Sequence, residues 1–164
     1  MDRIARVGAE PVGQPEPVGQ QQVGERLRLA EIRATALTVD EVLEAVAGPR
    51  AGGLAVFVGT VRDHDGSRPV RQLAYSAHPS AERVLHQVAD RALSDPQVLA
   101  GAVLHRVGPL QVGDVAIVAA VACAHRVDAF AVCRRLVDDV KSQVPIWKHQ
   151  VFADGTEEWV GAAT

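Results

Sequence analysis

The sequence has little that would take the chain into a membrane or out of the cell. No run of apolar residues among its 164 positions is long enough to cross a bilayer. The first residues, MDRIARVGAEPVG, lack the apolar segment of a secretory signal. We therefore expect a cytoplasmic protein of single-domain length, in which 48% of apolar residues suffices for a core.

The sequence also has few cysteines and a small net charge. The two cysteines, Cys123 and Cys133, form no Cys-x-x-Cys pattern, and we expect them to stay reduced and to pack as small apolar residues. A zinc site built from Cys123, His125 and Cys133 would lack a fourth ligand at a suitable spacing, so no metal is predicted. The net charge of −3 gives no reason to expect nucleic acid as a partner.

The amino-acid composition of the first half of the chain changes at residue 26. Residues 1–25 are rich in Gly, Pro, Gln and Val and are predicted to form a flexible tail, which leaves 26–164 as the folded domain. An alternating segment predicts a strand from Arg26, and the spacing of Thr38 and Glu41 predicts a capping box that opens a helix. The nearly continuous apolar run at 54–61 predicts a strand that is buried on both faces.

The second half alternates helices with pairs of strands. Strands are predicted at 70–77, 99–108 and 114–124, and a hairpin is predicted to turn at Asp154-Gly155. One helix should start at Pro79-Ser80 and end before Pro96, and a longer one should cover 127–144. An apolar stripe on the longer helix comprises Phe130, Cys133, Val137, Val140 and Val144. This order predicts an α+β domain with a mixed or antiparallel sheet.

Basic residues gather at the ends of these predicted elements. His125 and Arg126 come where the long helix begins, and free backbone N–H groups at such a point bind anions. Lys141 and Lys148 stand on either side of Pro145, and Arg62 follows the apolar strand. Each has an ordinary structural explanation when taken alone, for example a lysine that complements the helix dipole. Together they indicate an anion-handling pocket.

Two segments, the turn after the apolar strand and the pair at 105–106, contain residue types that bind metals. Asp63-His64-Asp65-Gly66 begins like a calcium loop but lacks the later ligands, so we interpret it as a turn. His105-Arg106 has no further metal ligand at helical spacing.

Several longer motifs occur in a specific order and spacing. They are FVGTVRDHDG (57–66), HRVGPLQVGD (105–114), AHRVDAF (124–130), LVDDVKSQVPIWKHQ (136–150) and DGTEEWV (154–160). From about Leu27 to Gly161 the chain resembles the large, catalytic subunit family of molybdopterin synthase. The resemblance implies an α/β-hammerhead fold and a homodimer. Each subunit would bind a small ubiquitin-like sulfur carrier, which gives a heterotetramer.

The resemblance also implies an activity and a set of site residues. The thiocarboxylated Gly-Gly end of the carrier would supply sulfur to cyclic pyranopterin monophosphate, forming the dithiolene of molybdopterin in molybdenum cofactor biosynthesis. No cofactor is implied for this sulfurtransferase. The catalytic lysines would be Lys141 and Lys148. The substrate-binding positions, which include both lysines, would be Thr60, Val61, Arg62, His125, Arg126, Lys141, Lys148, His149 and Gln150. His125 and Arg126 would reach the pocket of the neighbouring subunit.

The sequence departs from the family at a few positions. Many relatives carry Glu at the place of Gln150, Glu at the place of Ser76 and an aromatic residue at the place of His78. We expect the loss of a carboxylate to leave the lysines less paired. Two alternatives stay open: a non-catalytic paralogue that binds the carrier or a dimer partner, and a small-anion-binding α+β domain unrelated to sulfur transfer.

Overall fold

The computed structural model describes residues 26–161, so the predicted tail at 1–25 lies outside the described part of the chain. Its elements are β1 (Leu27–Arg33), α1 (Val39–Val46), β2 (Gly53–Thr60), β3 (His64–Asp65), β4 (Arg68–Ala77), α2 (Ala81–Ala92), β5 (Val98–Arg106), β6 (Gly108–Leu110), β7 (Val115–Cys123), α3 (Arg126–Gln143), β8 (Ile146–Phe152) and β9 (Glu157–Gly161). The predicted α+β class is confirmed. Only the short strands β3 and β6 were missed, because they lie in segments with the composition of turns.

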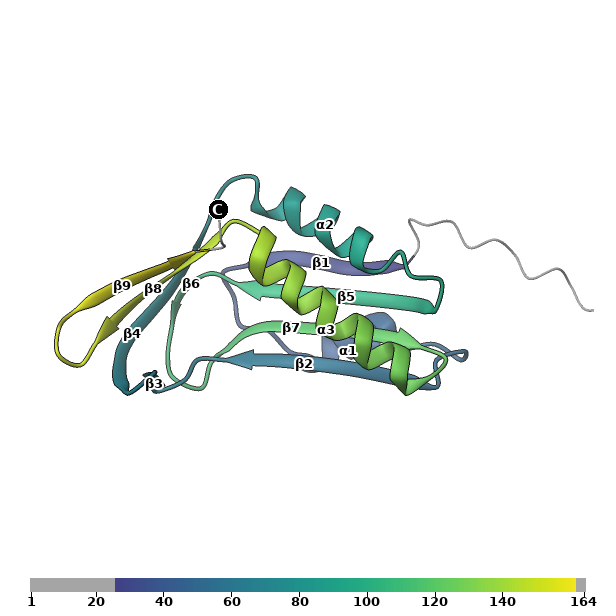
Figure 1. Ribbon diagram of the computed structural model, residues 1–164, viewed down its shortest axis with the longest axis horizontal. Coiled ribbons are helices and arrows are strands. Elements are labelled where there is room, and N and C mark those ends of the chain that lie inside the picture. Colours follow the sequence, from purple (N-terminus) through teal and green to yellow (C-terminus); the bar gives the residue numbers. More distant parts are fainter. Residues whose placement is uncertain (1–25, 162–164) are drawn as a thin grey trace, which may run out of the picture.

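Two sheets make up the domain. The first has the order β1-β5-β7-β2, with β1 and β5 parallel and the other pairs antiparallel. Helices α2 and α3 cover one face and α1 covers the other, which gives two apolar cores (Figure 1). The second sheet, β3-β4-β8-β9 with β6 paired to β4, stands at one end of the first (Figure 1). Within residues 26–161, no helix combines the length and the apolar character needed to span a bilayer.

Strand β2 is the edge of the first sheet, and the prediction that it is buried on both faces is wrong. Its alternate residues Leu54, Val56 and Val58 are exposed, whereas Ala55 between them is buried. The core on their face is formed by α1, β5 and β7, so α1 leaves β2 uncovered. A run of apolar residues therefore marks an exposed apolar edge here, which monomers generally avoid.

Helix α3 confirms the predicted long helix, with one correction to its apolar stripe. Cys133, Val137 and Val140 are buried, but the Phe130 side chain is 67% exposed. The buried face is completed instead by smaller or branched residues, including Leu136. Phe130 lies beside β2, where both elements line a hollow of about 240 Å³ that includes Val56.

The start of α1 differs in detail from the predicted capping box. Thr38 is the N-cap residue, but its side chain makes no capping hydrogen bond. The Glu41 carboxylate instead accepts two hydrogen bonds from the Arg33 guanidinium, at 2.8 and 2.7 Å. Because a bidentate charged pair is stronger than a neutral cap, Glu41 ties α1 to β1 rather than closing the helix end.

The predicted C-terminal hairpin is confirmed by β8 and β9. Gly155 has φ of 84° at its turn, a conformation that favours glycine, and the Asp154 carboxylate accepts a hydrogen bond from the Thr156 backbone N–H at 2.9 Å. On its other side β8 pairs with β4, so the hairpin is an integral part of the second sheet.

Candidate active site

The two lysines are brought together by the break after α3. Pro145 disfavours a helical conformation in the preceding residue, and Val144 is extended, with φ −76° and ψ 124°. Lys141 therefore lies in the last turn of α3, and Lys148 follows on β8 against β4. Both line one cavity of about 290 Å³, together with Thr60 at the end of β2.

A second cavity of about 180 Å³ shares these residues and extends toward the turn after β2. Six of the predicted site residues line it: Thr60, Val61, Arg62, Lys141, Lys148 and Gln150. They come from three separate parts of the sequence. Three cationic side chains, Arg62, Lys141 and Lys148, thus converge at the junction of the two sheets.

Asp65 is the electrostatic centre of this junction, and the sequence had indicated only a turn there. Its Oδ2 accepts hydrogen bonds from Lys148 Nζ at 2.9 Å and from Gln150 Nε2 at 2.7 Å, and its Oδ1 lies 3.4 Å from an Arg62 guanidinium nitrogen. The Gln150 hydrogen bond, followed by the Lys148 contact and the Arg62 charge, lowers the pKa of Asp65 to about 2. Asp65 is therefore a carboxylate at any physiological pH.

The expectation that a lost carboxylate leaves the lysines less paired does not describe Lys148, which has a carboxylate partner from another strand. Lys148 has an ion-pair partner, and its side chain is only 22% exposed. Gln150 is 1% exposed, and its Nε2 also donates to Glu158 Oε2 at 2.8 Å. A carboxylate is thus present beside Lys148, but it comes from β3 and not from β8.

Lys141 has a different environment. Its side chain is exposed, and among residues 26–161 no carboxylate lies within ion-pair distance of its ammonium group. Its Nζ lies 5.4 Å from the centre of the Phe57 ring, a weak cation–π contact. Lys141 and Lys148 are the only lysines of the whole sequence. Within residues 26–161, one of the two ammonium groups therefore has a carboxylate partner and the other has none, and both lie at this site.

Two further residues of the lysine cavity were not among the predicted site residues. Tyr75 and His105 line it and pack edge to face, with ring centroids 5.1 Å apart. Burial lowers the pKa of His105, and the nearby charge of Lys141 adds to this effect. Burial also raises the pKa of Tyr75, with a smaller contribution from Asp65. Near pH 7 both side chains are therefore uncharged, although the cavity that they line also contains two lysines.

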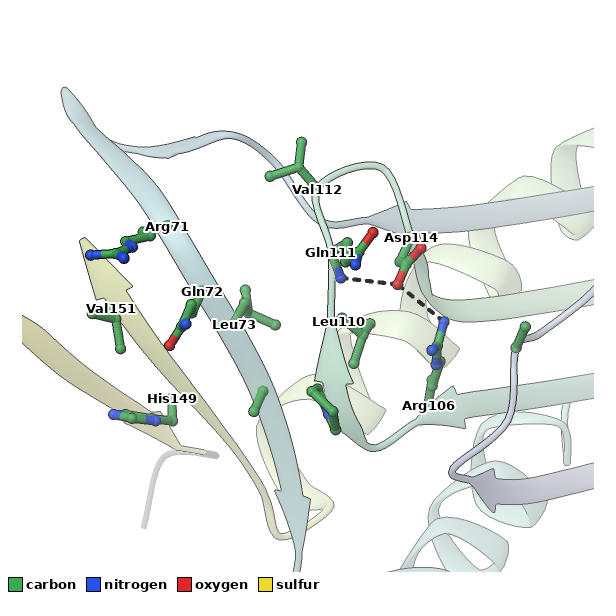
Figure 2. A pocket seen from close by; sticks show the side chains of 13 residues that line it. Arg71, Gln72, Leu73, Arg106, Leu110, Gln111, Val112, Asp114, His149 and Val151 are labelled. Atoms are coloured by element: carbon green, nitrogen blue, oxygen red, sulfur yellow. Dashed lines mark hydrogen bonds and ion pairs between the residues drawn. The ribbon is translucent and has the colours of Figure 1, made fainter. Parts of the chain in front are cut away.

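His149 lies on the opposite face of the second sheet from Lys148, because side chains alternate along a strand. Its imidazole stacks on Trp159 at a centroid distance of 4.3 Å and its Nε2 lies 3.0 Å from Glu157 Oε2. Of the predicted site residues, it is the one that lines a separate hollow of about 970 Å³ (Figure 2).

That larger hollow has a different chemistry from the lysine cavity. Its charged groups include Arg106 and Asp114, which point toward each other and are 3.3 Å apart (Figure 2). The same Asp114 carboxylate accepts the Gln111 backbone N–H at 2.9 Å. The charges of Arg106 and Asp114 are paired with each other, whereas three cations converge on the smaller cavities, which makes these the stronger candidate for an anion site.

His125 and Arg126 do not join the lysines within one chain. Both are exposed at the start of α3, at the end of the first sheet away from the second sheet (Figure 1). Fifteen residues separate Arg126 from Lys141, which corresponds to about 22 Å along a helix. A role for them in a lysine cavity requires that cavity to belong to another copy of the chain.

The fold and these side chains define an α+β protein with a concave, cation-lined site suited to phosphate or carboxylate groups. Comparison with known proteins then identifies the family of this chain. The family model "MoaE protein" matches residues 32–143. "Molybdopterin synthase catalytic subunit 1" of Mycobacterium tuberculosis is 43% identical over 126 residues, which cover 76% of this chain and 85% of that protein.

Two other relatives agree. The molybdopterin synthase catalytic subunit of Arabidopsis thaliana is 38% identical over 138 residues, covering 82% of this chain and 69% of that protein. The crystal structure of molybdopterin synthase from Staphylococcus aureus superposes with a TM-score of 0.74 at 31% identity, over 80% of this chain and 96% of that chain. The chain therefore belongs to the MoaE family, whose members matched here are catalytic subunits of molybdopterin synthase, an enzyme of molybdenum cofactor biosynthesis.

Proposed function

We propose that this chain transfers sulfur from the thiocarboxylated end of a small ubiquitin-like carrier to cyclic pyranopterin monophosphate, forming the dithiolene of molybdopterin. The observation that carries this proposal is the convergence of Lys141 and Lys148 on one cavity. Both the phosphate of the pterin and the thiocarboxylate of the carrier are anions, and cations that converge on one cavity bind such groups.

The two lysines have different environments, which suggests different roles. Lys148 and Arg62, held around Asp65, bind and orient the anionic groups. Lys141, which has the mobility of an exposed side chain, moves protons during the transfer. Thr60 and Val61 complete the wall of the cavity, and Gln150 acts through Asp65. The presence of both lysines in the cavity favours a catalytic subunit over a non-catalytic paralogue.

The site is completed by a second copy of the chain. The exposed apolar residues of β2, with Phe130 of α3, form an edge suited to an isologous contact. Gly53 at the start of β2 lies beside Arg126, whereas Thr60 at its end lies in the lysine cavity. A twofold axis across β2 brings the Arg126 end of one copy toward the Lys141 end of the other. His125 and Arg126 would thereby supply the partner's cavity with further groups for phosphate.

Substitution of Lys141 tests the reaction. Lys141→Ala should abolish dithiolene formation from thiocarboxylated carrier and cyclic pyranopterin monophosphate, while the carrier still binds. Arg83→Ala is the control, because Arg83 is an exposed cation of α2 that lines neither lysine cavity. Normal turnover by Lys141→Ala would exclude the catalytic role, and no turnover by the unsubstituted protein would exclude the proposed function.

Mixed dimers test whether Arg126 acts on the partner's cavity. Arg126→Ala and Lys141→Ala chains should each be inactive as homodimers. In a mixed dimer, one cavity carries both substitutions and the other carries neither. Co-expression in equal amounts should therefore restore about a quarter of the normal activity. Lack of any recovery would show that Arg126 serves its own chain.

A cytoplasmic location stays a prediction of the sequence, and cell fractionation would check it.

A further inference from the structure

The contacts around Lys148 are more specific than binding of an anion requires. Asp65 Oδ2 receives both Lys148 Nζ at 2.9 Å and Gln150 Nε2 at 2.7 Å. Lys148 and Gln150 are two residues apart on β8, so their side chains leave the same face of the strand. Asp65 reaches them from β3, a two-residue strand in the turn that follows β2.

The orientation of Gln150 is determined by its neighbours. Its Nε2 donates to two carboxylates, Asp65 at 2.7 Å and Glu158 at 2.8 Å. A flipped amide would place an oxygen between two negatively charged groups, which is strongly unfavourable. Because Gln150 is only 1% exposed, water cannot readily replace these hydrogen bonds. Gln150 thus holds Asp65 at a fixed place.

We propose that Asp65 is a positioning residue for Lys148, and that Gln150 fixes Asp65 in this role. The inference rests on the proposed function, since it assigns to Lys148 an anionic substrate group. Lys148 has a long, flexible side chain, and an ammonium that must meet a reacting group loses rate when its position varies. Asp65 removes this freedom and leaves the other N–H bonds of the ammonium for the substrate.

Kinetics distinguish positioning from a purely structural role. Asp65→Asn keeps the size of the side chain and removes its charge, and kcat should fall between about tenfold and 100-fold. KM for the pterin monophosphate should stay constant or fall, because a negative charge is removed near a bound phosphate. Lys148→Ala should lower kcat at least as far and should also raise KM, because it removes the cation itself. Asp63→Asn is the matched control two residues earlier, at an exposed aspartate that lines neither lysine cavity.

A double substitution tests whether Asp65 acts through Lys148. In the Lys148→Ala background, Asp65→Asn should lower the residual kcat by less than about twofold, since the group to be positioned is gone. A purely structural role would instead give the same fold decrease in both backgrounds. That additive result would overturn the proposal.

Nuclear magnetic resonance of the lysine ammonium groups supplies a readout that needs no turnover. Protein labelled with ¹⁵N-lysine contains only two such groups, and Lys148→Arg assigns them. Asp65→Asn should shift the Lys148 signal and broaden it by faster exchange with water, while leaving the Lys141 signal unchanged. Asp63→Asn should change neither signal. An unaltered Lys148 signal in an active protein would overturn the positioning role alone. Absence of turnover in the unsubstituted protein would overturn the proposed function and, with it, this role in the reaction.

Discussion

Replacement of Gln150 by Glu is the sharpest test of the polar network at the site. The change preserves shape but converts a donor, placed 2.7 Å from Asp65 and 2.8 Å from Glu158, into an acceptor. Two hydrogen bonds to charged groups are lost, each of about 1.5–3 kcal/mol. A third carboxyl group also enters a site that is 1% exposed at this residue. We expect Gln150→Glu to lower the free energy of unfolding at pH 7 by roughly 3–5 kcal/mol.

The pH dependence of this loss has a definite sign. Burial beside two carboxylates raises the pKa of the new glutamate above its unfolded value, so the folded state binds the proton more tightly. The destabilisation should therefore be largest near neutral pH and should shrink as the pH falls through the raised pKa. Urea unfolding at pH 7 and pH 5, followed by tryptophan fluorescence and circular dichroism, measures both values.

Gln72→Glu is the matched control, because Gln72 lies on the adjacent strand β4 and is exposed. Its effect should stay within about 0.5 kcal/mol. Glu158→Gln should restore part of the loss in Gln150→Glu, since an amide at 158 can donate to the new carboxylate. A coupling energy of at least about 1 kcal/mol is expected between the two sites. If Gln150→Glu matched Gln72→Glu in stability, the described network would be wrong.

Three further outcomes follow from the core and the site. Gly101→Ala should cost about 1–3 kcal/mol of unfolding free energy in urea titrations, because a Cβ there would lie 2.3 Å from a methyl carbon of the buried Leu93. Gly48→Ala is the control with open space around it, and equal stability of the two variants would contradict the packing. Leu85→Ala removes a side chain that is fully buried between α2 and the sheet, and should lower the unfolding free energy by about 2–5 kcal/mol. His105, whose neighbours in the cavity include Tyr75 and Lys141, has a lowered pKa and so binds its proton less tightly folded than unfolded. Stability should therefore fall as the pH drops below about 6.5, by no more than about 1.4 kcal/mol per pH unit from this group, and His105→Gln should lack that contribution. Identical pH profiles of the two proteins between pH 7.5 and 5.5 would show that His105 is not the source.

The sequence by itself determined most of the secondary structure, because that structure follows from local patterns. The 3.6-residue periodicity before Pro145 indicated α3, and Asp154-Gly155 indicated the turn between β8 and β9. Local patterns also indicated that basic residues lie at the ends of the helices and strands. They could not indicate that Leu54, Val56 and Val58 would be exposed, since a buried strand and an exposed apolar edge have the same composition.

Tertiary structure decided which of the candidate residues meet. Side-chain alternation in β8 separates His149 from Lys148 and Gln150, and the length of α3 separates Arg126 from Lys141. The contacts of Asp65 with Lys148 and Gln150 were invisible in the sequence because more than eighty residues separate it from both. A salt bridge of that kind depends on how strands far apart in the sequence are arranged within one sheet, and no local pattern records it.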